Sequence, residues 1–426
     1  MRTQSTRTPE LLAPAGGLAQ LEAALRFGAD AVYLAADRFG LRQRAANFAL
    51  DDVPAAAARA HDAGAKAYAT LNALMDADDL KALPAYLEAL AAAGVDAFIV
   101  SDLGALRLAQ RYAPNVELHV STQASVCNAE AARVWHELGA SRVVCAREMS
   151  VEDIARLRAG APRELELEAF VHGAMCMAVS GRCLISAALT GRSGNKGHCT
   201  QPCRWSYALV EEQRPGEFFP VEEDVRGTYV MNAQDLNMLA HLDDLAAAGI
   251  DSFKIEGRNK KAFYVASVVR PDMASGVRAY RLALDGVPSS ELADELLAVS
   301  HRPYGTGFYY GDARQSPDVD GYTAECRHAA TVEACEPAGE GAFRVIARCY
   351  NRFCEGDELE ALSPGPHIPL VRVRNLAWLP APDGDDAQPK RVPVAVANRS
   401  AERYAFETGE ELAPGDFLRM RINVER

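Results

Sequence analysis

Residues 93–121, AGVDAFIVSDLGALRLAQRYAPNVELHVS, contain one complete strand–helix–strand unit. A short apolar run at 97–101 ends in polar residues, and the following LGALRLAQRY repeats its apolar residues at helical spacing. A second strand-like run occupies 117–121. Neighbouring strands joined by a helical crossover run parallel, so this stretch predicts one unit of a parallel α/β fold.

The same alternation extends in both directions from this unit. Glycine closes several helices directly before the next strand, as in FGADAVY and AAGIDSFKI. The eight expected strands are 10–13, 31–35, 66–71, 97–101, 117–121, 142–146, 166–171 and 252–256. Eight strands with helical crossovers predict a (β/α)8 TIM-type barrel. An open, doubly wound sheet is the alternative, although LLAPAGG lacks the GxGxxG spacing typical of that fold.

The pattern divides the chain into three parts. Residues 8–290 are predicted to form the barrel domain, with an insertion at 172–235 where the crossover after the seventh strand is unusually long. The aromatic, Gly-rich region within 291–322 is predicted to be a linker. From 323 to 426 apolar residues alternate with period two between turns such as EGDE and PDGDD, which predicts a small C-terminal all-β barrel domain.

Bulk composition narrows the class of protein. The 426 residues are too many for one small core, which agrees with two domains. The first residues lack an apolar leader, and no apolar run is long enough to span a membrane, so we expect a cytoplasmic protein without a membrane partner. Its cysteines should then be thiols or metal ligands. The formal net charge of -13 argues against a protein that coats nucleic acid but permits a local basic site.

The expected insertion concentrates thiols and positive charge. From 169 to 210 the sequence has no Asp or Glu, so the cations there are uncompensated along the chain. The cysteines of this segment are Cys176, Cys183, Cys199 and Cys203, and its cations include Arg192, Lys196 and Arg204. The cations are suited to an anionic partner such as a metal–thiolate centre or phosphate.

Four thiolates in one segment suit either a tetrahedral zinc site or an iron–sulfur cluster. The spacing is C-x6-C, fifteen residues, then C-x3-C, which matches zinc-ribbon hooks poorly. A cluster is larger and its ligands sit in loops, which agrees with the many glycines here. The remaining alternative is a set of unrelated buried or free cysteines.

The sequence resembles peptidase family U32 in several stretches. These are EAFVHGAMC (168–176), SGRCLIS (180–186), GRSGNKGHCTQPCRW (191–205), ELLAPAG (10–16), GADAVYL (28–34), RAANF (44–48) and FKIEGRNKKAFYVASVV (253–269). The family was named for collagenolytic activity. The resemblance implies, for better-founded members, oxygen-independent hydroxylation: of a tRNA wobble uridine to 5-hydroxyuridine with prephenate, of a cytidine in 23S rRNA, or of the ubiquinone ring. It also implies a 4Fe-4S cluster on the four cysteines.

The resemblance favours the tRNA group, because a β-rich C-terminal region follows the KIEGR motif. It implies tRNA or rRNA as macromolecular partner, a small dicarboxylate metabolite, and a separate electron-donor protein. Peptide hydrolysis is the alternative function. No HExxH or GxSxG motif is present, but His172 and Cys176 lie four positions apart and offer a Cys–His pair. Hydrolysis and cluster binding therefore compete for Cys176.

Candidate site residues follow from the positions of strand ends, because barrel active sites lie at the carboxyl ends of the strands. The catalytic candidates are His172, Glu168, Lys254 and Glu256. The candidates for holding substrate are Arg42, Arg44, Asn72, Gln123 and Arg258, with Arg192, Lys196 and Arg204 for RNA phosphates. Arg and Lys are expected because carboxylates and phosphates bind guanidinium and ammonium groups.

Overall fold

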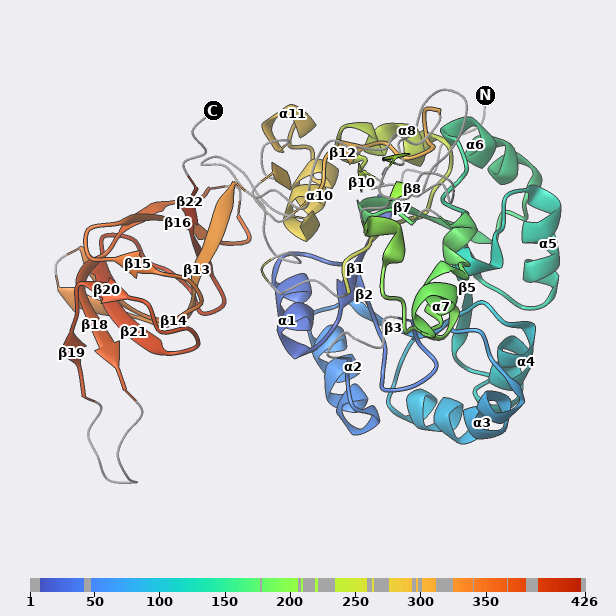
Figure 1. Ribbon diagram of the computed structural model, residues 1–426, viewed down its shortest axis with the longest axis horizontal. Coiled ribbons are helices and arrows are strands. Elements are labelled where there is room, and N and C mark those ends of the chain that lie inside the picture. Colours follow the sequence, from blue (N-terminus) through green and yellow to red (C-terminus); the bar gives the residue numbers. More distant parts are fainter. Residues whose placement is uncertain are drawn as a thin grey trace. The chain divides into compact units, whose positions relative to one another are not determined.

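The computed structural model divides into two compact units, shown in Figure 1. It describes residues 8–41, 47–176, 178–205, 208–209, 219–220, 234–258, 263, 276–292, 296–297, 301–311, 325–339, 341–365, 367–380 and 390–422. The barrel unit comprises Met1–Leu25, Ala29–Lys260 and Arg302–Gly321, and the C-terminal unit comprises Arg26–Gly28, Lys261–His301 and Tyr322–Arg426. The boundaries expected from the sequence differ from this division in assigning 261–290 to the barrel and 291–322 to a linker.

The barrel unit is a closed ring of parallel strands. Its strands are β1 (Glu10–Ala15), β2 (Ala31–Leu34), β3 (Lys66–Leu71), β4 (Ala97–Val100), β5 (Glu117–Val120), β6 (Arg142–Val144), β7 (Glu166–Ala174) and β11 (Ser252–Ile255). Each pairs with the next, and β11 pairs with both β7 and β1, which closes the ring. The prediction of a barrel rather than an open sheet is confirmed. Each strand begins at the residue expected from the sequence.

Helices surround the ring, as the ribbon shows (Figure 1). They are α1 (Leu18–Arg26), α2 (Val53–Asp62), α3 (Ala77–Ala92), α4 (Leu103–Tyr112), α5 (Ala129–Glu137), α6 (Val151–Gly160) and α8 (Leu242–Ala247), with short 3-10 turns η1 (Leu50–Asp52), η2 (Thr122–Ala124) and η6 (Leu239–His241). Asp76 and Ser150 begin α3 and α6 with capping boxes. Gly94 and Gly249 have positive φ values of 83° and 93°, which lets the chain turn from a helix into β4 and β11.

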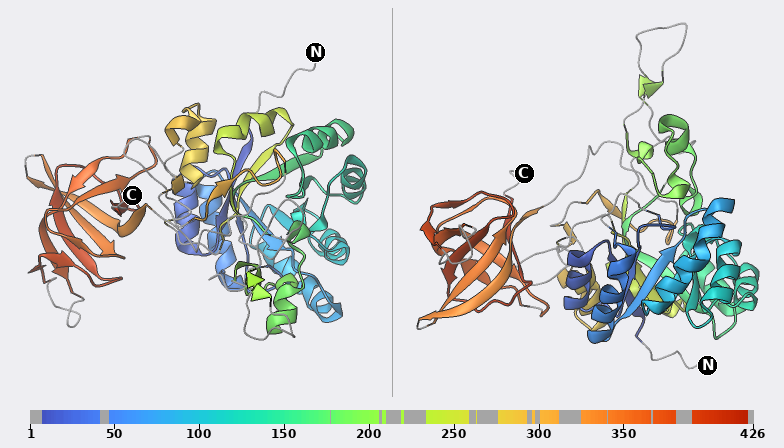
Figure 2. Two further views of the ribbon diagram at one scale, coloured as in Figure 1. Left: turned by 45° about the horizontal axis from the view of Figure 1, so that its top comes forward. Right: turned by 90° about the horizontal axis from the view of Figure 1, so that it is seen from below.

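The insertion after the seventh barrel strand, β7, is confirmed and lies at one end of the barrel (Figure 2). Its elements are η3 (Val179–Gly181), α7 (Ile185–Thr190), η4 (Gly194–Lys196), η5 (Pro202–Arg204), β8 (Ala208–Leu209), β9 (Phe219–Pro220) and β10 (Asp235–Asn237). β10 pairs antiparallel with β7, and β12 (Tyr304–Gly305) pairs parallel with β10. The insertion therefore leaves the barrel at the carboxyl end of β7 and returns to the same strand.

In the described part of the C-terminal unit there are two helices before residue 323 and antiparallel sheets after it, which confirms the all-β character expected there. The helices are α10 (Gly276–Leu284) and α11 (Ser289–Leu292). The strands are β13 (Cys326–Gly339), β14 (Ala342–Cys349), β15 (Phe353–Cys354), β16 (Glu358–Leu362), β17 (Leu370–Arg372), β18 (Arg374–Leu379), β19 (Val392–Pro393), β20 (Val396–Ala397), β21 (Arg403–Thr408) and β22 (Phe417–Arg421). Alternate residues such as Val345 and Ala347 fill its core, which is why period two predicted strands here.

Candidate functional site

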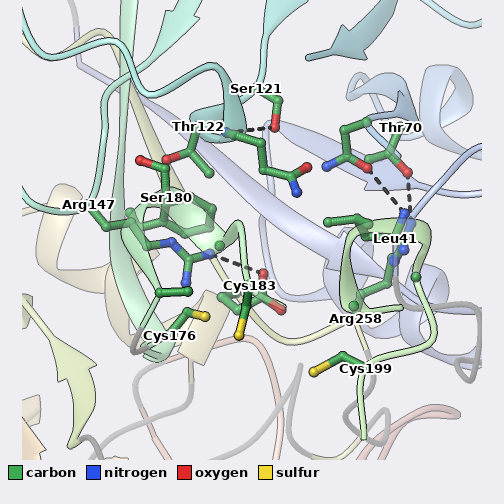
Figure 3. A pocket seen from close by; sticks show the side chains of 18 of the residues that line it. Leu41, Thr70, Ser121, Thr122, Arg147, Cys176, Ser180, Cys183, Cys199 and Arg258 are labelled. Atoms are coloured by element: carbon green, nitrogen blue, oxygen red, sulfur yellow. Dashed lines mark hydrogen bonds and ion pairs between the residues drawn. The ribbon is translucent and has the colours of Figure 1, made fainter. Parts of the chain in front are cut away.

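A pocket of about 560 Å³ opens at the carboxyl ends of the barrel strands. One part of its wall comes from strand ends and the loops after them, and the other from the insertion (Figure 3). The barrel contributes Tyr33, Leu41, Thr70, Asn72, Ile99, Ser121, Thr122, Gln123, Val144, Arg147, Phe170, Lys254, Glu256 and Arg258. This position is where barrel proteins place their active sites.

All four cysteines of the insertion line this one pocket: Cys176, Cys183, Cys199 and Cys203. In the close view, the sulfur atoms of Cys176, Cys183 and Cys199 face a common space on one side of the pocket (Figure 3). Within the described residues, no three His, Cys, Asp or Glu side chains lie close enough together to hold a single metal ion. The tertiary structure thus gathers thiols that are spread over 28 positions of sequence.

Two of these sulfur atoms accept hydrogen bonds from the backbone. The amide of Ile185 donates to Cys183 Sγ, and the amide of Gln201 donates to Cys199 Sγ, both at 3.4 Å. Amide donors favour the thiolate form and tune thiolate-bound metal centres. The loops thus hold two of the pocket sulfur atoms through backbone hydrogen bonds.

The insertion is fastened to the barrel by hydrogen bonds. The carboxylate of Glu148, which follows β6, accepts from the amide and hydroxyl of Ser180 at 2.6 and 3.0 Å. Asn195 accepts from the amide of Leu74 through its carbonyl at 3.0 Å and from the amide of Cys183 through its side chain at 3.1 Å. These bonds position the cysteine loops against the strand ends.

Among the described residues, three cationic side chains line the pocket. The guanidinium of Arg258, which is almost fully buried, donates to Thr70 Oγ1 at 2.8 Å. Arg147 lies over the ring of Phe170 at 3.9 Å and donates to the Ala174 carbonyl at 3.1 Å. Lys254 is the third cation. Two guanidinium groups and an ammonium in one pocket favour an anionic ligand.

The sequence predicted two of these cations and missed the third. Arg147 stands three positions beyond the end of β6, in CAREMS, and its place just after a strand was a pattern that could have identified it. Glu256, predicted as catalytic, also lines the pocket, and its carboxylate lies 3.7 Å from Arg147 Nη2. The described wall of the pocket therefore carries one carboxylate beside its cations.

Two predicted amide side chains lie in the pocket. Asn72 Oδ1 accepts from the Leu41 amide at 3.2 Å, which fixes its orientation. Gln123 is 5% exposed, and its Oε1 has no hydrogen-bond partner among the described residues. A buried polar atom without a partner is costly, so Gln123 is suited to a ligand that donates a hydrogen bond.

Glu168 lies in the barrel interior rather than in the pocket wall. Its Oε1 is 2.6 Å from Lys254 Nζ, and its Oε2 is 3.1 Å from Arg142 Nη1. Burial alone would raise the pKa of Glu168, but Lys254 and Arg142 lower it below its usual value. Arg142 continues the network to Glu10 and Glu166, each at 2.6 Å. This network of paired charges therefore reaches the pocket through Lys254, which lines it.

The structure separates His172 from the pocket. His172 is 1% exposed and is not among the residues that line the cavity with Cys176. Its ring centroid lies 5.5 Å from that of Tyr304 in β12. The Cys–His pair that the sequence offered for peptide hydrolysis therefore gains no support from the pocket's geometry.

The expected RNA-binding cations have different surroundings. The charge of Lys196 is compensated by two carboxylates. It forms ion pairs with Asp76 and, at 3.1 Å, with Asp79 of the α3 capping box. Arg192 has no ion-pair partner among the described residues, and its carbonyl accepts from Ser186 at 2.7 Å. Arg204 lies in η5, directly after Cys203. The predicted Arg42 and Arg44 lie outside the described residues.

The fold and the site place the protein among (β/α)8 barrel proteins with a pocket at the carboxyl ends of the strands. Cysteines and arginines line this pocket. The family model of peptidase family U32 matches residues 16–318. The chain belongs to this family. No helix among the described residues is both long and apolar enough to cross a bilayer.

Three relatives show how similar the chain is to proteins with assigned roles. The tRNA hydroxylation protein P1 of Bacillus subtilis is 34% identical over 424 residues, which cover 97% of this chain and 95% of the relative. The tRNA hydroxylation protein P of Escherichia coli is 34% identical over 408 residues, covering 84% of this chain and 87% of the relative. A 23S rRNA 5-hydroxycytidine synthase of Escherichia coli is 38% identical over 266 residues, covering 62% of this chain and 39% of the relative.

Proposed function

We propose that this protein hydroxylates RNA without molecular oxygen, and that its substrate is a tRNA wobble uridine that becomes 5-hydroxyuridine. The observation that carries the proposal is one pocket lined by four cysteines together with Arg147, Arg258 and Lys254. Similarity over nearly the full length to the Bacillus subtilis tRNA hydroxylation protein supports tRNA as the RNA. The 23S rRNA relative matches only 62% of this chain, so ribosomal RNA is the second candidate.

The cysteines fit an iron–sulfur cluster by their chemistry. Four cysteines line one cavity, and backbone amides donate to the sulfur atoms of two of them. Cys176, Cys183, Cys199 and Cys203 would hold a 4Fe-4S cluster, since such clusters take four thiolate ligands. When bound, the cluster supplies one-electron transfer, and the protein holds the reactants in register. A separate redox protein would exchange electrons with the cluster, because hydroxylation without oxygen withdraws two electrons from the base.

The cationic wall fits a small dicarboxylate. Arg147 and Arg258 present planar guanidinium groups that bind carboxylates through paired hydrogen bonds. The unsatisfied Gln123 Oε1 adds an acceptor for an N–H or O–H of a ligand. We propose prephenate as this co-substrate, because its two carboxylates match two guanidinium groups.

The RNA base must leave its stack to reach a buried pocket. Enzymes that modify bases take the target out of the helix or act on single-stranded loops. Arg182 is exposed on the insertion, and Trp205 is 47% exposed. These residues would bind phosphate and stack on a base, respectively.

Nucleoside mass spectrometry of tRNA from a deletion strain tests the proposal. We expect 5-hydroxyuridine to disappear and to return when the wild-type gene is restored. A Cys183→Ser gene should fail to restore it, whereas a Cys127→Ser gene should succeed, because Cys127 is exposed and lies outside the pocket lining. Unchanged tRNA with loss of hydroxycytidine in 23S rRNA would favour the second candidate. Unchanged RNA together with cleavage of peptides by the purified protein would favour the peptidase function.

A further inference from the structure

Lys254 differs from the other lysines of the chain in its surroundings. Lysine occurs at only seven positions, and among the described residues only Lys254 lines the pocket. Its side chain is 6% exposed, whereas that of Lys81 on α3 is 76% exposed. The other cations of the pocket are arginines, which cannot lose their proton in a protein. Lys254 is therefore the one cation of the described pocket wall that can become a nucleophile.

A base stands next to this amine. Glu168 Oε1 is 2.6 Å from Lys254 Nζ, within reach for proton transfer. The carboxylate is held by Arg142 Nη1 at 3.1 Å and faces Ser252 Oγ at 3.5 Å on its other oxygen. A nucleophile, a base and a group that orients the base are the arrangement found where enzymes form covalent intermediates.

The surroundings of the amine are suited to an imine. Lys254 Nζ lies 4.6 Å from the centre of the Tyr33 ring and 5.7 Å from that of Phe170. Aromatic rings exclude water from the nitrogen, and exclusion of water protects a reactive intermediate from hydrolysis. The hydroxyl of Tyr33 donates to the Ile255 carbonyl at 2.9 Å, which fixes this ring against β11.

The remaining walls define the ligand. A lysine nucleophile requires a carbonyl carbon, and the guanidinium groups of Arg147 and Arg258 require an anion in the same molecule. A small 2-oxo acid carries both groups on adjacent carbons. A second carboxylate would suit the pocket further, because two arginines line it.

We propose that Lys254 forms an imine with the carbonyl of a small 2-oxo acid bound in this pocket. The Lys254 ammonium gives one proton to Glu168, and Nζ attacks the carbonyl carbon. The carbonyl oxygen then leaves as water, taking the proton back from Glu168 and one from the nitrogen, with a protonated C=N bond as the product. The sum is ammonium plus ketone giving iminium plus water, so no oxidant or reductant takes part. This step adds a covalent intermediate to the proposed function. Its place in the RNA reaction rests on that function.

Reductive trapping tests the imine without RNA and without turnover. The full-length protein is incubated with pyruvate, 2-oxoglutarate or prephenate and treated with sodium borohydride, which reduces an imine to a stable amine. Peptide mass mapping should find Lys254 heavier by the mass of the acid less one oxygen atom. Succinate, which has no ketone, should give no adduct.

Matched variants make the result specific. Lys254→Arg keeps a cation beside Glu168 and should remove the adduct at this position, at least tenfold below wild type. Lys81→Arg should leave trapping at Lys254 unchanged, and Glu168→Gln should slow it at least tenfold. The inference is overturned if none of the three acids labels Lys254, or if exposed lysines are labelled to the same extent. It stands if Lys254 is labelled even when the deletion strain keeps its 5-hydroxyuridine, an outcome that would sink only the proposed function.

Discussion

Lys196 Nζ lies 3.1 Å from Oδ2 of Asp79, and the same ammonium contacts Asp76, the N-cap residue of α3. The hydrogen bond from Lys196 lowers the pKa of Asp76 to about 2, and the bonds to Asp76 and Asp79 raise the pKa of Lys196. This ion pair joins the cysteine insertion to a helix of the barrel. It also means that Lys196 is already engaged with two carboxylates when an RNA approaches.

Arg192, which has no ion-pair partner among the described residues, and Lys196 should therefore contribute unequally to RNA binding. We expect Arg192→Ala to weaken tRNA binding and to reduce the slope of log K against log salt by about one, as for the loss of one phosphate contact. Lys196→Ala should reduce the slope by less, because its charge is neutralised locally. Filter binding over a range of salt concentrations measures both slopes. Equal losses for the two variants would contradict this distinction.

Iron binding should depend on the pocket cysteines and not on cysteines elsewhere. We expect protein purified without oxygen to contain iron and acid-labile sulfide. Cys183→Ser and Cys199→Ser should lose most of both, because each removes one of the four proposed sulfur ligands. Cys127→Ser is the matched control, since that thiol is exposed and does not line the pocket. Wild-type protein without iron, or equal loss in the control, would argue against the cluster.

Removing Arg142 should destabilise the barrel strongly. Its guanidinium contacts Glu10, Glu166 and Glu168 in the interior. Arg142→Met leaves buried carboxylates without their cation, which typically costs about 3–5 kcal/mol. Arg133→Met removes a pair with Glu130 on the surface and should change the free energy of unfolding by less than about 1 kcal/mol. Urea unfolding of the two variants gives both changes in the free energy of unfolding. Similar losses of stability in the two would refute the role of the buried network.

Stability should fall as the pH drops below the usual pKa of histidine because of His119. Burial lowers the pKa of His119 below its usual value of 6.5, so the native imidazole stays neutral to a lower pH than the imidazole of the unfolded chain. As the pH falls through about 6.5, the unfolded chain binds a proton that the native state does not, and the free energy of unfolding decreases. His119→Phe keeps a ring against Tyr68 and should flatten this dependence between about pH 7 and 5.5. An unchanged slope in the variant would show that another group is responsible.

Gly173 should tolerate no side chain. It has a φ of +107°, and a Cβ there would collide with the Glu256 carbonyl oxygen, just beyond the point where β7 and β11 change register. Gly64 has a φ of +77° with nothing near its missing Cβ, so it isolates the cost of backbone strain. We expect Gly64→Ala to cost about 1 kcal/mol and Gly173→Ala at least about 2 kcal/mol more. Thermal unfolding of the two variants decides this, and equal costs would show that β11 can move aside.

The positions of the barrel strands were predictable because their cause is local. Apolar periodicity and the glycines that end helices act over a few neighbouring residues, so every strand start from Glu10 to Ser252 could be found in the sequence. The insertion was visible for the same reason, as a crossover too long for one helix. Strand ends were less predictable: β7 extends to Ala174, where β10 pairs with it.

The grouping of the four cysteines was predictable in part. The sequence showed four thiols in one glycine-rich segment, and the fold gathers all four around one pocket. The partner of Lys196 was not visible, because Asp76 lies 120 positions away along the chain. A count of charges along one segment does not show which carboxylates from a distant loop will lie next to that segment in the folded chain.

What the sequence by itself determined is the order of strands and helices, the place of the insertion and the four cysteines within it. Only the tertiary structure decided which side chains meet. Closing the ring brings β1, β6, β7 and β11 together, so that Glu10 meets Arg142 and Glu168 meets Lys254 across 132 and 86 positions. The same closure brings Arg147 into the pocket and leaves His172 outside its lining. The physical reason is that periodicity records which face of a strand is buried, whereas ion pairs in a barrel depend on the register between distant strands.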